Sequence, residues 1–95
     1  MTELLLRTSP APDRTRVLVI GALDHRTAHQ FREQMSRLIT ADDTRAYLVI
    51  DLRCCTHADD HGSKAWSDAC AAAQAAGKEL ALEGVPPLIE DLLRI

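Results

Sequence analysis

Apolar and polar positions change period along the chain, and the changes predict its secondary structure. Leu4–Thr8 and Arg16–Ile20 are apolar runs of strand length, and a turn over residues 9–13 with two prolines separates them. Proline cannot donate to a strand ladder and aspartate favours turns, so these runs predict a hairpin whose first strand lies at a sheet edge. Gly21 is predicted to end the second strand.

Two segments have the 3.6-residue period of helices. Thr27 and Gln30 form a capping-box pattern at the start of the first, in which both side chains satisfy free amides. The apolar face that follows consists of Ala28, Phe31, Met35, Leu38 and Ile39. The second helix is predicted after Gly62 and is expected to stop at Gly77. Its apolar stripe consists of Ala65, Trp66, Ala69, Cys70 and Ala73.

The remaining elements complete an alternation of strands and helices. Residues 46–52 form an almost uninterrupted apolar run, which is typical of a strand buried within a sheet. Glu79–Glu83 alternates as a strand does, and Pro86–Pro87 opens a last predicted helix. The predicted order is therefore β-β-α-β-α-β-α. Strands separated by helices favour parallel pairing, so we expect an α/β domain with a four-stranded mixed sheet and helices mainly on one face.

Composition and charge narrow the class of protein. The 95 residues suit one domain, residues 1–95. A net charge of −3, with no basic stripe among aromatic residues, argues against nucleic-acid binding.

The start of the chain does not resemble a signal peptide, and no apolar run approaches the roughly 18 residues that indicate a membrane span. The three cysteines do not form a disulfide framework, so we expect a cytoplasmic protein without membrane insertion. A domain this small buries a modest fraction of its surface, which leaves a homodimer open.

Candidate chemistry is concentrated at two turns. The first is Gly21–Asp24, and the second is Asp59–Gly62, at the predicted start of the second helix. His57 and Cys54–Cys55 lie close to the second turn, and these residue types also bind zinc. The sequence has no Cys-x-x-Cys pair, so a histidine-rich surface turn without a metal is the preferred interpretation. The sequence has no glycine-rich phosphate loop and no nucleophile beside an evident base, so neither an enzyme nor a cofactor is expected.

The two turns resemble the signature turns of the STAS family, the anti-sigma-factor antagonists. Gly21-Ala22-Leu23-Asp24 resembles the family's Gly-Glu-Leu-Asp, and Asp59-Asp60-His61-Gly62 resembles its Asp-Ser-Ser-Gly. The predicted order of elements matches the STAS fold, and the resemblance covers essentially the whole chain. In that family a partner kinase phosphorylates the first Ser of the second turn. The phosphorylation-equivalent position in this chain is Asp60.

The resemblance implies a bacterial anti-sigma factor antagonist that binds an anti-sigma factor with a serine-kinase fold and so regulates sigma-dependent transcription. The alternative is a non-switching STAS scaffold, or an accessory subunit of a multi-protein or transporter complex that contains other STAS proteins. The residues that would form the partner-binding loop and the adjoining helix are Asp59, Asp60, His61, Gly62, Ser63, Lys64 and Trp66, flanked by Asp24 and His25.

Four alternatives stay open. Asp60 either mimics phosphoserine and keeps the protein in a released state, or meets a partner that has adapted to it, and we lean to the second hypothesis. Ser63 or Ser67 could offer a displaced phosphorylation site. Trp66 either packs in the core, which is the commoner role, or exposes its edge to a partner. Asp59 and Asp60 also have a purely structural interpretation as caps of a helix N-terminus.

Overall fold

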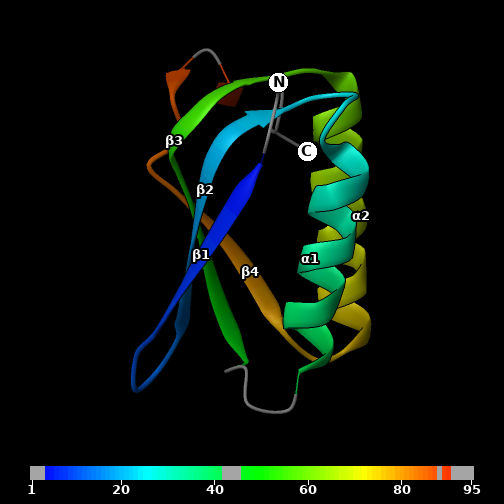
Figure 1. Cartoon of the computed structure of the whole chain (residues 1–95). Coiled ribbons are helices and arrows are strands. Elements are labelled where there is room, and N and C mark those ends of the chain that lie inside the picture. Colours follow the sequence, from blue (N-terminus) through cyan, green and yellow to red (C-terminus); the bar gives the residue numbers. More distant parts are fainter. Residues whose placement is uncertain (1–3, 42–45, 88, 91–95) are drawn as a thin grey trace.

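A four-stranded sheet and two long helices form two packed layers (Figure 1). The computed structural model describes residues 4–41, 46–87, 89 and 90. Its elements are β1 (Leu5–Pro10), β2 (Thr15–Leu23), α1 (Ala28–Thr40), β3 (Tyr47–Ala58), α2 (Asp60–Ala75) and β4 (Glu79–Glu83). This is the predicted order up to the fourth strand. Residues 87, 89 and 90 are helical, and the rest of the predicted last helix lies mostly outside the described residues.

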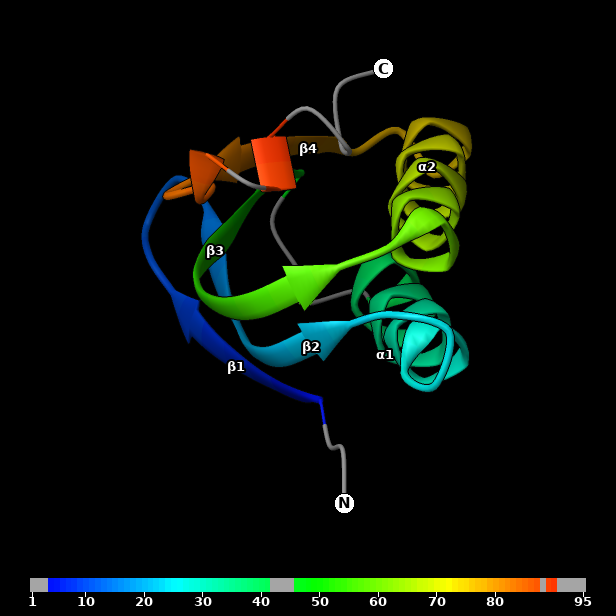
Figure 2. The same ribbon diagram turned by 90° about the horizontal axis from the view of Figure 1, so that it is seen from above.

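The sheet order β1-β2-β3-β4 agrees with the predicted pairing. β1 pairs antiparallel with β2, while β2–β3 and β3–β4 are parallel. β1 therefore lies at an edge and β3 lies inside the sheet, as the hairpin and the long apolar run predicted. Because each parallel connection passes through a helix, α1 and α2 lie together on one face of the sheet (Figure 2).

The core lies between this face and the two helices. β2 contributes Val17 and Val19, which are fully buried, while the alternating residues of that strand are only partly buried. The fully buried residues of α1 that complete the layer are Phe31 and Met35. Trp66 of α2 is 5% exposed and belongs to the same cluster, so it packs in the core as the commoner role predicted. Burial of each such large side chain stabilises the fold by about 1.5–3 kcal/mol.

β1 extends to Pro10, into the predicted turn, and two further strands are longer than predicted. β2 does not end at Gly21, where the prediction was wrong, but continues to Leu23. Gly21 has a φ of 112°, and the register between β2 and β3 shifts immediately after it. Glycine accommodates this bulge without ending the pairing. β3 likewise continues beyond residue 52 to Ala58, which pairs with Leu23 and brings the two signature turns to the same end of the sheet.

The capping-box prediction for α1 was also wrong. Thr27 is the N-cap residue, but its side chain makes no capping hydrogen bond. Its hydroxyl donates instead to the Ala22 carbonyl oxygen at 2.7 Å and accepts from the Asp24 amide at 3.0 Å. The Gln30 amide donates to the Leu4 carbonyl oxygen at 2.6 Å. Both side chains therefore join α1 to the sheet, because buried backbone groups of other segments lie within their reach.

The end of α2 agrees with the prediction. The helix finishes at Ala75, and Gly77 follows with a φ of 74°, the left-handed conformation that stops helices. The Gly77 amide donates to the Gln74 carbonyl oxygen at 3.1 Å. None of the helices in the described part of the chain is both long and apolar enough to span a membrane.

Candidate functional site

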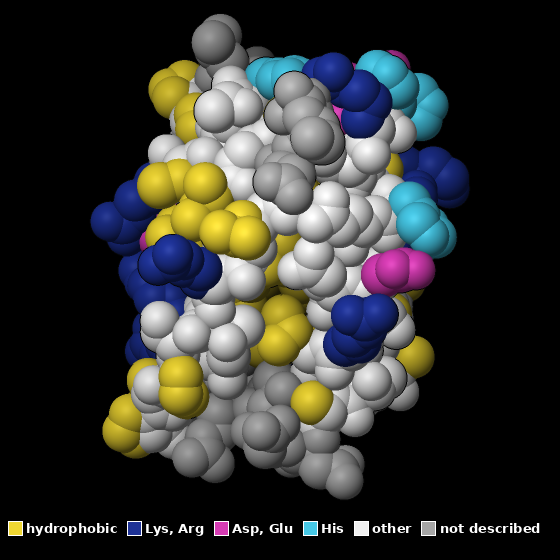
Figure 3. All heavy atoms as spheres, in the orientation of Figure 1, with side chains coloured by type: hydrophobic (Ala, Val, Ile, Leu, Met, Phe, Trp, Pro, Cys, Tyr) yellow, Lys and Arg dark blue, Asp and Glu magenta, His cyan; other side chains and the backbone are white. Residues whose placement is uncertain are grey.

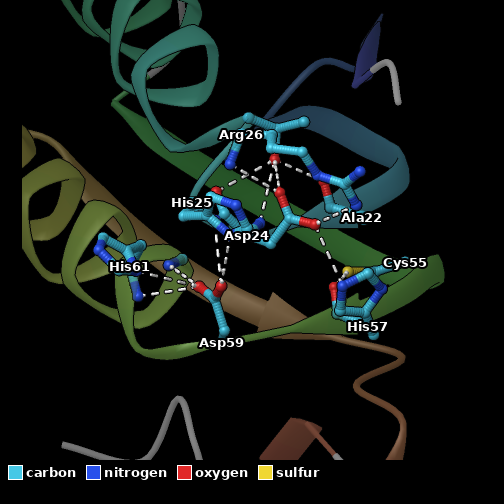
Figure 4. A network of polar contacts seen from close by, with 10 residues as sticks. Ala22, Asp24, His25, Arg26, Cys55, His57, Asp59 and His61 are labelled. Atoms are coloured by element: carbon cyan, nitrogen blue, oxygen red, sulfur yellow. Dashed lines mark hydrogen bonds and ion pairs between the residues drawn. The ribbon is translucent and has the colours of Figure 1, made fainter. Parts of the chain in front are cut away.

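The two signature turns meet at the carboxyl ends of β2 and β3 (Figure 4). These strands are parallel neighbours, so their ends lie at the same edge of the sheet. The Asp59 amide donates to the Leu23 carbonyl oxygen at 3.2 Å, which connects the start of α2 to the end of β2. The structure thus brings together the two turns that the sequence placed far apart along the chain.

Asp59 is the N-cap of α2 and also contacts the first turn. Its carboxylate accepts hydrogen bonds from the amides of His61 at 2.9 Å and Gly62 at 3.0 Å. It also accepts one from the His25 amide at 3.1 Å. Burial alone would raise the pKa of Asp59, but these backbone hydrogen bonds and a weaker contact with the His25 ring lower it below its usual value. Asp59 therefore stays ionised while it holds the two turns together.

Asp24 is the buried carboxylate of the site, with only 2% of the residue exposed. It accepts hydrogen bonds from the Arg26 amide at 2.9 Å and the Arg26 guanidinium at 3.2 Å. His57 Nε2 lies 3.1 Å from the second carboxylate oxygen. Burial by itself would raise the pKa of Asp24, but the hydrogen bonds from Arg26 and the nearby charges of Arg26 and His57 lower it.

The sequence reasoning missed Arg26 and considered His57 only as a metal ligand. The predicted parallel pairing of the second and third strands was the available signal. It places both strand ends at one edge, where His57 beside the second turn meets the carboxylate of Asp24 in the first.

Three exposed histidines surround these carboxylates. His25 and His61 lie on either side of Asp59, with their ring centroids 5.9 Å apart, while His57 contacts Asp24. In Figure 3, histidine side chains gather at this end of the molecule. Within the described part of the chain, no group of three or more His, Cys, Asp and Glu residues could hold a metal ion. The histidine side chains instead form an exposed rim above the ionised, hydrogen-bonded carboxylates of Asp24 and Asp59.

Asp60 differs from Asp59 although the two are adjacent. It is the first residue of α2 and is exposed. Among the described residues, none donates a hydrogen bond to its carboxylate or pairs with it. Capping is therefore the role of Asp59, and the carboxylate of Asp60 points to solvent at the positive end of the helix dipole.

Gly62 is buried because α2 approaches β2 closely at this point. A Cβ atom at position 62 would overlap the backbone carbonyl of Leu23, so only glycine fits here.

The residues that follow Gly62 on α2 differ in exposure. Ser63 is partly buried, and its amide donates to the Asp59 carbonyl oxygen at 2.9 Å. Lys64, which follows Ser63 directly, is exposed, and its Nζ lies 4.0 Å from a carboxylate oxygen of Asp68, with which it can form an ion pair. Ser67 is exposed on the same helix.

The predicted site residues thus fall into three groups, of which Asp59 and Ser63 form the half-buried one. The exposed ones are His25, Asp60, His61 and Lys64. Asp24, Gly62 and Trp66 are buried and shape the loop from below. The buried residues therefore support the site from below, and only the exposed rim is available for direct contact with a partner.

Comparison with protein-family models matches residues 6–95 to the family described as Mlab, STAS domain. No curated protein matches the chain. Among solved structures, the chain is similar to the anti-sigma factor antagonist SpoIIAA in its unphosphorylated form. That likeness has a TM-score of 0.71 at 16% identity and covers 95% of this chain and 80% of the other. The phosphorylated form of SpoIIAA, a Bacillus cell fate determinant, has the same TM-score and identity, with 95% and 79% covered.

A third similar structure is the STAS domain of an antisigma-factor antagonist from Rhodobacter sphaeroides. Its TM-score is 0.64 at 18% identity, and the likeness covers 87% of this chain and 86% of that one. At these low identities the similarity shows a shared fold.

Proposed function

Because the chain belongs to the STAS domain family, we propose that it is an anti-sigma factor antagonist that binds an anti-sigma factor with a serine-kinase fold. Binding would occlude that factor and free a sigma subunit for transcription in the bacterial cytoplasm. The observation that carries the proposal is the exposed carboxylate of Asp60, which stands where the family has its phosphorylated serine. Since Asp59 caps the helix, Asp60 is left for the partner.

The proposed contact surface is the exposed rim of the site. It consists of His25, Asp60, His61 and Lys64, with Ser63 beside them. The buried residues act indirectly, since Asp24 and Asp59 set the shape of the two turns and Gly62 sets the distance between α2 and β2. Trp66 supports the first turns of α2 from the core and does not meet the partner.

Position 60 then acts without a phosphorylation switch. A carboxylate carries one negative charge where phosphoserine carries about 1.5–2, and it offers fewer acceptor oxygens. A serine kinase transfers phosphate to a hydroxyl, so Asp60 is not a substrate. The nearest hydroxyls in sequence on α2 belong to Ser63, which is partly buried, and Ser67, which is exposed. We favour a binder whose partner has adapted to Asp60 over a permanent phosphoserine mimic.

A second candidate function is that of a STAS scaffold or accessory subunit of a multi-protein or transporter complex. Two observations favour it. The matching family is described as Mlab, STAS domain, and not as an antagonist. The residue that would carry the antagonist switch is a carboxylate. In this function the same rim would bind a constitutive partner.

Affinity capture from a native cell extract, followed by mass spectrometry, separates the two candidates. The bait is the full chain, with Asp60→Arg as the test variant. Asp13→Arg is the matched control, because Asp13 is a 69% exposed carboxylate in the turn between β1 and β2, at the opposite end of the sheet (Figure 1). A kinase-fold anti-sigma factor that is lost only with Asp60→Arg supports the first function. STAS proteins or transporter subunits support the second, and capture insensitive to Asp60→Arg contradicts the proposed surface.

A further inference from the structure

The sheet face that α1 and α2 leave open carries a cavity of about 260 Å³. Three neighbouring strands line it, and the lining residues are Arg7 and Ser9 of β1, Arg16 and Leu18 of β2, and Asp51 and Arg53 of β3. The strand register explains their convergence, since Leu18 pairs with Arg7 on one side and with Asp51 on the other. In Figure 3, Lys and Arg side chains gather along this side of the sheet.

Asp51 organises the floor of the cavity. It is 2% exposed and accepts hydrogen bonds from the Arg53 amide at 3.0 Å and the Arg53 guanidinium at 2.8 Å. An Arg16 nitrogen lies 3.9 Å away. Burial alone would raise the pKa of Asp51, but the hydrogen bonds from Arg53 and the charges of Arg53 and Arg16 lower it. The ionised carboxylate thus holds two guanidinium groups at the cavity wall.

The cavity has an excess of positive charge on an acidic chain. Three guanidinium groups line it, while Asp51 is the only carboxylate among the lining residues. Glu83 of β4 pairs with Arg16 at the rim. Counting Arg7, Arg16 and Arg53 against Asp51 and Glu83 leaves a local charge of +1, whereas the whole chain carries −3. Arg7 is the source of this excess, because it is exposed and forms no ion pair with any residue that the structure describes.

We propose that this cavity binds the phosphate group of a small ligand. The guanidinium fork matches phosphate oxygens with two parallel hydrogen bonds, and a site with several such forks is typical of phosphate recognition. Arg7, Arg16 and Arg53 would donate to the phosphate, and the Ser9 hydroxyl would add a neutral donor. Drug-sized ligand pockets usually measure about 300–1,000 Å³, so this smaller cavity suits a phosphate with a small substituent. A soluble phosphate ester and a phospholipid headgroup share this chemistry.

Titration of the full-length, isotope-labelled chain with inorganic phosphate at low ionic strength tests the proposal by NMR. We expect saturable shifts of the amides of residues 7–9, 16–18 and 51–53. Arg7→Gln removes the unpaired guanidinium without touching Asp51 and should weaken binding about tenfold. Arg7→Lys should restore part of the affinity, because it restores the charge without the fork. The matched control is Arg37→Gln, which removes an exposed arginine from α1.

Sedimentation with lipid vesicles identifies the source of the phosphate. Vesicles of phosphatidylcholine with about one fifth phosphatidic acid are compared with pure phosphatidylcholine. If the protein sediments with the acidic vesicles but not with pure phosphatidylcholine, and this sedimentation depends on Arg7, the ligand is a lipid headgroup. Arg7-dependent binding of phosphate in solution, without sedimentation, supports a soluble ester. The proposal is overturned if phosphate produces no saturable shifts and vesicles no Arg7-dependent sedimentation. It is equally overturned if Arg37→Gln weakens binding as much as Arg7→Gln.

Discussion

His57 Nε2 and the carboxylate of Asp24 lie 3.1 Å apart, although His57 belongs to β3 and Asp24 to the turn after β2. The contact joins an exposed imidazole to a carboxylate that is almost completely buried. Arg26 donates two hydrogen bonds to that carboxylate from within the turn. The conformation of the first signature turn therefore depends on the strand that leads into the second.

Replacing this buried charge should destabilise the protein. Asp24→Asn keeps the shape of the side chain but loses the charge-assisted hydrogen bonds from Arg26 and weakens the contact with His57, so we expect a loss of about 1–3 kcal/mol at pH 7. Urea unfolding followed by circular dichroism measures the change. Glu79→Gln is the control, because Glu79 is an exposed carboxylate at the start of β4. An equal loss in both variants would contradict the role assigned to Asp24.

The same variant should alter the response to pH. The pKa of Asp24 is lower in the folded protein than in the unfolded chain, so the unfolded chain binds the proton more readily. Its stabilising contribution is complete above the unfolded pKa of about 3.9 and is lost as the pH falls through the folded pKa. The stability gap between wild type and Asp24→Asn should therefore shrink between about pH 5 and pH 2. A gap that stays constant over this range would show that Asp24 does not titrate with folding.

The two adjacent carboxylates of the second turn should differ in their effect on stability. Asp59→Ala removes an N-cap that accepts from two helix amides, and it should cost about 1 kcal/mol or more. Asp60→Ala removes a side chain with no partner among the described residues, and it should stay within about 0.5 kcal/mol of wild type. Thermal unfolding of the two variants provides the comparison. The reverse order would mean that Asp60 is the cap.

Gly62→Ala should be far more damaging than the same change at Gly77. Alanine is a better helix former than glycine by about 1 kcal/mol, but its Cβ at position 62 would overlap the Leu23 carbonyl. We expect the overlap to dominate and to cost at least about 3 kcal/mol, because a backbone group cannot move aside as a side chain can.

Gly77 provides the control for this comparison. A Cβ there would meet nothing within 4 Å, and only its φ of 74° disfavours alanine, at a cost of about 1 kcal/mol. Chemical denaturation of both variants measures the difference. Similar losses at the two positions would mean that α2 shifts away from β2 without penalty.

Asp60→Ser tests how the affinity for the partner depends on the side chain at position 60. Helix stability should change by less than about 1 kcal/mol, because Asp59 remains the cap. If the anti-sigma partner has adapted to the carboxylate, the variant should bind it more weakly. If Asp60 mimics phosphoserine, the variant should bind more tightly, and phosphorylation of the new serine should reverse the gain.

Isothermal titration calorimetry with the purified partner and each form of the protein distinguishes these results.

Wild type incubated with ATP and a cognate kinase should stay unmodified at residue 60. High-stoichiometry phosphate on Ser63 or Ser67 would mean that the switch has moved along α2. Unchanged affinity of Asp60→Ser would place residue 60 outside the interface.

The sequence by itself determined the order of elements, their pairing and the place of the signature turns. The long apolar run at 46–52 reports which faces of β3 are buried. The stripe that contains Phe31 does the same for α1. Such periods depend on neighbours along the chain, so they can be read without the fold. The replacement of the Asp-Ser-Ser-Gly pattern by Asp59–Gly62 was visible because this motif, too, consists of neighbouring residues.

Only the tertiary structure decided where individual polar groups go. The Thr27 hydroxyl turns to Ala22 and leaves the cap of its own helix unmade, because β2 extends past Gly21 and brings that carbonyl within reach. Arg7 and Arg53 line one cavity because Leu18 pairs with Arg7 on one side and Asp51 on the other, and Arg53 lies two residues beyond Asp51 on the same face of β3. A polar side chain selects its partner from segments that are distant in sequence, and local pattern contains no information about which of those segments arrives beside it.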